Sequence, residues 1–337
     1  MSRSLFQRYT FVDYATQAYS AMVALAIALF HNATVSHWPW LIAAHLLGLL
    51  TVHWLVQSSD WVRGSHRDQL PGQAARKAVY FLRHFYPVLL YIWFYSETGW
   101  LNRMFFRTYL DSVVIRCDQT LFGYQPSIVW MQKLPYLAVS EVLYAAYFSY
   151  YLMIFGVGLA LYLRSRSQFF HYISTVSFVF YICYAFYIAV PVIGPASLLH
   201  LVPGYSLPAD LQALAADANT PATVQSGVFY RVMNWIYEVF EAPGAAIPSS
   251  HVAIALCIVF FCFRYLRRVR FPLLALALLL CLSTIYCRYH YATDVLAGIA
   301  TAAALVPLGN WLYFKLEKPE LVGEETCQPN AAKAGET

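Results

Sequence analysis

Three ionisable side chains lie in one short stretch, YCRYHYATDVLAG, between two long apolar runs. His290 and Asp294 are four residues apart in it, a spacing that places two side chains on one face of a helix. A carboxylate so placed can hold one imidazole N–H and fix the tautomer of the ring. A histidine oriented in this way suits nucleophilic attack on phosphorus, so this pair predicts phosphoryl transfer through His290.

A second histidine follows the polar stretch AAIPSS at the start of another apolar run. Serine favours the N-cap of a helix, proline suits its first turn, and the free N–H groups there can bind an anion. We therefore predict that Ser249 and Ser250 bind phosphate oxygens and that His251 protonates the leaving oxygen. An ordinary N-cap uses the same serine groups, so a purely structural role for the two serines stays open.

Long apolar helices must position these residues. Of the 337 residues, 60% are hydrophobic and only 12% are charged, a composition typical of an integral membrane protein. Strands that alternate apolar and polar residues, as in an outer-membrane barrel, are not recognisable. We predict an all-α polytopic membrane helical bundle, with about eight transmembrane helices near residues 14–31, 38–57, 78–97, 136–163, 169–190, 250–266, 271–288 and 292–314.

The basic residues predict which helix ends face the cytoplasm. With eight spans and the N-terminus inside, most of the 22 lysines and arginines fall in short inner segments, and Arg83 falls within the third span. The formal charge of +5 therefore reports membrane topology and does not indicate nucleic acid. The active site is predicted to face outward, which for a bacterial inner membrane means the periplasm.

Two long segments are predicted to lie outside, roughly 98–135 and 191–249. The first contains DQTLFGYQPSIVW, a turn-rich segment that we expect to pack under the active site. The second contains the breaker VPVIGPAS and the amphipathic run VFYRVMNWIYEVF. That run is a helix that either lies along the membrane surface or packs on the bundle.

The two histidine motifs resemble those of a known family. PSSH followed by HYATDVLAG is similar to the second and third motifs of the type 2 phosphatidic acid phosphatase superfamily, PSGH and SRxxxxxHxxxDxxAG. DQTLFGYQP and RYHYATDVLAG most resemble the inositolphosphotransferase-like branch, which includes inositol phosphorylceramide synthases. The resemblance covers a six-helix catalytic core at 78–314, with two further transmembrane helices in 1–77 and a polar cytoplasmic tail at 315–337.

The resemblance implies a lipid-phosphate phosphatase or phosphotransferase that forms a phosphohistidine and needs no cofactor or metal. It places the nucleophile on His290, the supporting aspartate on Asp294 and the acid on His251, as the residues themselves suggest. The chain departs from the family at Ser250, where glycine is usual, and at Thr284, where arginine is expected. It also lacks the first motif, KxxxxxxRP, and has Ala196 where the branch has an arginine.

A basic group for the phosphate must therefore come from elsewhere in the chain. Arg288 lies one helical turn beyond Thr284, and its fork-shaped guanidinium can bind two phosphate oxygens. We predict that Arg288 binds the phosphate, and the alternative is that it snorkels to lipid headgroups.

Two other classes of protein stay open. His251, His290 and Asp294 could form a two-His-one-carboxylate metal site, although the ten histidines are scattered and form no clustered boxes. A lipid transporter is the non-enzymatic alternative, but its ionisable groups would be expected near the bilayer midplane. The predicted partners are a lipid phosphate and membrane lipids.

Overall fold

The computed structural model describes residues 8–58, 70–196, 219–240 and 242–316. In these residues the structure is helical, with one isolated bridge between Val192 and Ala245. The helices are α1 (Phe11–Phe30), α2 (Trp38–Gln57), α4 (Leu70–Leu101), α5 (Asp111–Phe122), α6 (Pro126–Lys133), α7 (Leu137–Arg164), α8 (Arg166–Ala189), α11 (Ala222–Gln225), α12 (Val228–Phe240), α13 (Ser250–Tyr265), α14 (Arg270–Tyr286) and α15 (Ala292–Leu316).

Each predicted span coincides with a helix, which confirms the all-α bundle. Five helices, α1, α2, α7, α8 and α15, are long and apolar enough to cross a membrane, and α13 and α14 are shorter apolar helices. The longest helix, α4, carries Arg83, His84 and Glu97 within its apolar sequence. The number of eight spans stays a prediction, and the tail from residue 317 lies outside the described residues.

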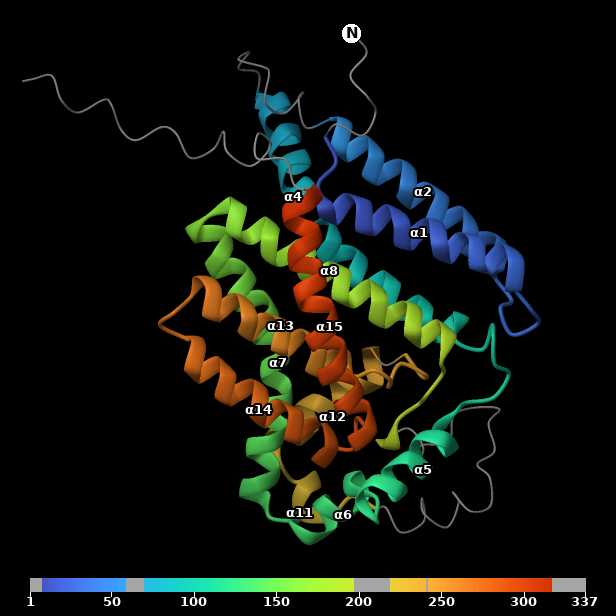
Figure 1. Cartoon of the computed structure of the whole chain (residues 1–337), viewed down its shortest axis with the longest axis vertical. Helices are drawn as coiled ribbons and strands as arrows, with labels where there is room; N and C mark the ends of the chain where they lie inside the picture. Colours follow the sequence, from blue (N-terminus) through green and yellow to red (C-terminus); the bar gives the residue numbers. More distant parts are fainter. Residues whose placement is uncertain (1–7, 59–69, 197–218, 241, 317–337) are drawn as a thin grey trace, which may run out of the picture.

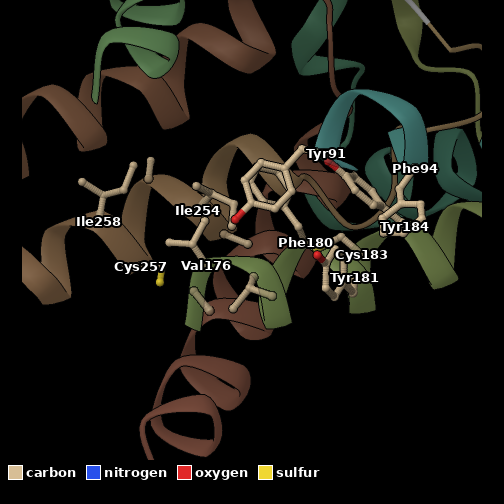
Figure 2. Close-up of a cluster of buried hydrophobic side chains, with 14 of the residues drawn as sticks. Tyr91, Phe94, Val176, Phe180, Tyr181, Cys183, Tyr184, Ile254, Cys257 and Ile258 are labelled. Carbon is tan, nitrogen blue, oxygen red and sulfur yellow. The ribbon is translucent and has the colours of Figure 1, made fainter. Parts of the chain in front are cut away.

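Helix α13 lies at the centre of the bundle. It packs against α7, α8, α14 and α15, and most of its side chains are buried. Figure 2 shows Ile254, Cys257 and Ile258 of α13 in one apolar cluster with side chains of α4 and α8. The sequence of α13 is apolar all round, as expected for a central helix that is buried on all sides.

Helix α8 joins the first helices to the rest of the bundle. It contacts α1 and α4 on one side and α7, α13 and α15 on the other. A buried ion pair adds a polar link between α1 and α4, because Arg83 donates to both carboxylate oxygens of Asp13 at 2.8 and 2.6 Å. Tyr86 also donates to Asp13, at 2.7 Å. Arg83, unusual within an apolar helix, is thus paired with a buried carboxylate.

The four shorter helices gather at one end of the bundle, where α15 begins (Figure 1). The segment DQTLFGYQPSIVW is more helical than its turn residues suggest: it contains the end of α5 and most of α6, joined at Gly123, whose φ is 76°. The amphipathic run forms α12 as expected. It packs on α7 through buried Met233 and leaves Trp235 exposed, so the packing on the bundle is confirmed and the position along the membrane surface stays a prediction.

Candidate active site

The site is built around the turn between α14 and α15, residues 287–291. Helix α14 ends in a Schellman motif, in which Tyr289 N donates to Thr284 O and Arg288 N donates to Ile285 O. His290 N also donates to Thr284 O, at 3.1 Å. The sequence prediction that His290 and Asp294 share one helical face is wrong, because His290 precedes the first residue of α15.

The turn nevertheless brings His290 and Asp294 together. The distance from His290 Nδ1 to Asp294 Oδ2 is 3.5 Å, and both side chains are buried. Asp294 Oδ2 also accepts a 2.9 Å hydrogen bond from Tyr291 N. The backbone bond fixes the carboxylate at the start of α15, so it faces Nδ1 of the imidazole and leaves Nε2 available on the other side of the ring.

His251, in the first turn of α13, occupies that other side. Its Nδ1 lies 3.3 Å from His290 Nε2, and its Nε2 lies 2.9 Å from the hydroxyl of Tyr147 on α7. Tyr147, His251, His290 and Asp294 therefore form a continuous polar chain from α7 to α15. Tyr147 was not predicted, because nothing in the sequence around it distinguishes it from the other 26 tyrosines.

The two serines before His251 hold the start of α13. Ser249 is the N-cap, and its hydroxyl accepts from Val252 N at 3.4 Å. Ser250 N donates to the hydroxyl of Tyr187, which itself donates to Pro248 O. These contacts are those of helix capping, so a role for Ser249 and Ser250 in phosphate binding stays a prediction.

Arg288 lies in the same turn as His290, two residues before it, and is only 2% exposed. This burial does not fit a side chain that snorkels to lipid headgroups. Among the described residues, Arg288 is the one non-glycine residue with positive φ, at 64°. It therefore does not continue α14 by one more turn, as its spacing from Thr284 suggested.

Two buried carboxylates of α5 also contact the end of this turn and the first residues of α15, and neither was predicted. Asp118 accepts hydrogen bonds from Ala292 N and Thr293 N at 3.0 and 2.8 Å. Asp111 accepts from the Tyr291 hydroxyl at 3.0 Å. Asp118 belongs to the segment that we expected to pack under the site. The sequence therefore indicated its approximate position but not its hydrogen bonds.

A cavity of about 670 Å³ lies at the opposite end of α13 and is not part of this site. Its lining includes Arg164, Arg264, Arg267 and Arg268. Within the described parts of the chain, no group of three or more His, Cys, Asp or Glu side chains is arranged to hold a metal ion.

The long apolar helices indicate an integral membrane protein. Residues 112–308, more than half of the chain, match the PAP2 superfamily. The chain belongs to this superfamily, which confirms the predicted superfamily but does not test the inositolphosphotransferase-like branch. No curated protein and no protein of solved structure matches the chain.

Proposed function

We propose that this protein removes or transfers the phosphoryl group of a lipid phosphate through a phosphohistidine on His290, at the extracytoplasmic face of the membrane. The observation that supports this most is the polar chain of Tyr147, His251, His290 and Asp294 at the adjoining ends of α7, α13 and α15. Membership of the PAP2 superfamily supports the same class of enzyme.

In the first step, His290 Nε2 attacks phosphorus while the bond from phosphorus to the lipid oxygen breaks. Asp294 holds Nδ1–H and stabilises the positive charge that develops on the ring. His251 donates its Nδ1 proton to the leaving oxygen, and Tyr147 holds the opposite nitrogen of His251. The present 3.3 Å contact between the two rings occupies the place of the phosphorus atom, so substrate entry must displace the His251 ring.

In the second step, an oxygen nucleophile releases the phosphoryl group. His251 accepts a proton from water or from an alcohol, whose oxygen attacks phosphorus as the bond from nitrogen to phosphorus breaks. Water gives hydrolysis and a lipid alcohol gives transfer, because both acceptors attack the same intermediate. Kinship with the inositolphosphotransferase-like branch, suggested by RYHYATDVLAG, would favour transfer.

The geometry of the histidines disfavours the metal-site alternative. Asp294 faces Nδ1 of His290, whereas His251 faces Nε2, on the opposite side of the ring. One metal ion can bind only one nitrogen of an imidazole, so it cannot bind the carboxylate and both rings in this arrangement. A transporter is disfavoured because these groups lie at helix ends and not in the middle of the spans.

The proposal is tested with purified protein and a panel of labelled lipid phosphates, with and without lipid alcohols, followed by product identification. We expect turnover that persists in EDTA, and a phosphoenzyme that is labile to acid and stable to base. His290→Ala should abolish both turnover and the phosphoenzyme, whereas His37→Ala, which alters an exposed histidine before α2, should change neither. A fully active His290→Ala protein would overturn the proposal.

A further inference from the structure

We propose that Asp111 and Asp118 of α5 are positioning residues. Their carboxylates hold the three residues that follow His290 and so fix His290 against Asp294. This inference rests on the proposed function. The family resemblance assigns no role to either carboxylate.

Asp118 supplies the cap that α15 lacks in its own sequence. The first four N–H groups of a helix need partners from outside the helix, and the residue before α15 is Tyr291, which cannot cap it. Both carboxylate oxygens of Asp118 take this role, with Ala292 N at 3.0 Å on one oxygen and Thr293 N at 2.8 Å on the other. The Thr293 hydroxyl donates to the same carboxylate at 2.5 Å. A negative charge at this end of α15 is also favoured by the helix dipole.

Asp111 joins the turn to the segment that leaves α8. Its two oxygens accept from Ile193 N and Gly194 N, each at 3.0 Å, and one of them also accepts from the Tyr291 hydroxyl. A Cβ on Gly194 would lie 2.9 Å from Tyr289 O, so the segment lies directly against the turn. Ala196 N donates to Arg288 O at 2.7 Å, which adds a second link.

The two carboxylates act on the same side of α5 because they are seven residues apart, close to two helical turns. Both are fully buried, and they hold the three residues that follow His290. Loss of either should let the turn shift relative to Asp294. A displacement of about 1 Å at a reacting group lowers a rate by about 10²-fold.

Asparagine is a sharp replacement at both positions. It keeps the size of the side chain, but its amide NH₂ would face a backbone N–H that now donates to a carboxylate oxygen. We expect Asp118→Asn and Asp111→Asn to lower kcat on p-nitrophenyl phosphate by about 10²-fold with KM little changed. Asp118→Glu should restore part of the activity, because it keeps two acceptor oxygens. Glu238→Gln, at an exposed carboxylate of α12, is the matched control and should be neutral.

A second readout does not depend on any substrate. In protein labelled with ¹⁵N-histidine, the His290 signals, assigned by their loss in His290→Ala, should report one tautomer in the wild type. Asp118→Asn should change them toward a mixture of tautomers, and Glu238→Gln should not. If the wild type turns over no phosphate ester, the proposed function fails, and the tautomer measurement alone then decides the positioning role.

Two results would overturn the inference. One is an Asp118→Asn protein with wild-type kcat and unchanged His290 signals. The other is a loss of kcat that disappears when activity is divided by the amount of folded protein, because the role of Asp118 would then be structural only. If Asp118→Asn does not fold, Thr293→Val, which removes only the hydroxyl donor to Asp118, is judged by the same criteria.

Discussion

Replacement of Arg288 should separate the stability of the turn from its function. Arg288 occupies the C′ position of the Schellman motif that ends α14, where glycine is usual because the backbone is left-handed. A non-glycine residue there is strained by about 1–2 kcal/mol. Such strain at a buried cation in the turn that carries His290 is expected where the side chain is needed for function.

The comparison of Arg288→Gly with Arg288→Ala isolates this strain, since both lose the guanidinium. Glycine removes about 1–2 kcal/mol of strain, and its greater freedom in the unfolded chain returns about 0.4–1 kcal/mol. Arg288→Gly should therefore be more stable than Arg288→Ala by about 1 kcal/mol, which for a chain of this size raises Tm by about 1–2 °C. Thermal unfolding in detergent micelles measures this difference.

Both variants should lose activity to the same extent. Removal of one group that binds the developing negative charge typically lowers kcat by about 10²–10³-fold. Arg288→Lys keeps the charge but loses the fork, so it should also lose most activity, whereas Thr284→Ala, at the position of the family arginine, should be mild. Near-normal turnover in folded Arg288→Ala protein would show that Arg288 does not bind phosphate, and Arg231 or Lys133 would be tested next. Equal stability of the glycine and alanine variants would refute the strain argument.

Three further predictions follow from other parts of the structure. Burial raises the pKa of Asp111 from 3.8 to about 6, so the folded protein binds this proton more tightly than the unfolded chain does. The resulting gain in the stability of the wild type is complete below pH 3.8 and is lost as the pH rises through about 6. The stability of Asp111→Asn relative to the wild type should therefore rise between these pH values, by up to about 3 kcal/mol, and a flat difference would refute this. The exposed Cys117 of α5 should react with an impermeant maleimide from outside in intact cells, and this labelling should vanish in Cys117→Ser; labelling only after permeabilisation would reverse the topology. Trp235→Ser, on the exposed side of α12, should raise KM for a lipid phosphate and leave p-nitrophenyl phosphate unaffected, and an equal effect on both would argue against lipid contact.

The sequence predicted the helices well because the apolar runs are long and are broken by charged or turn residues. The bundle and the superfamily were predicted from such runs and from PSSH and HYATDVLAG. The local geometry of His290 was not predicted correctly. A spacing of four residues indicates a shared helical face only if both residues belong to the helix. Here the left-handed backbone at Arg288 ends α14, and α15 starts after His290.

The partners of the candidate site were harder to predict because they come from distant parts of the chain. Asp118 is 174 residues from Ala292, and Tyr147 is 104 residues from His251. Neither pair has a spacing that helix periodicity can reveal, and an aspartate or tyrosine in an outer segment is ordinary on its own. Only the packing of α5 on α15 and of α7 on α13 brings these groups together.

The position of the site at helix ends is suited to a phosphate on a lipid headgroup. His251 lies where α13 begins and His290 just before α15, and the proposed function requires a lipid headgroup to reach these two helix ends. Helix α12 contacts the same turn, since the rings of Tyr237 and Tyr289 are 4.8 Å apart, and it exposes Trp235. An amphipathic helix with an exposed tryptophan favours the headgroup region. Under the proposed function, a lipid phosphate would reach the buried polar chain of Tyr147, His251, His290 and Asp294 from the side of α12.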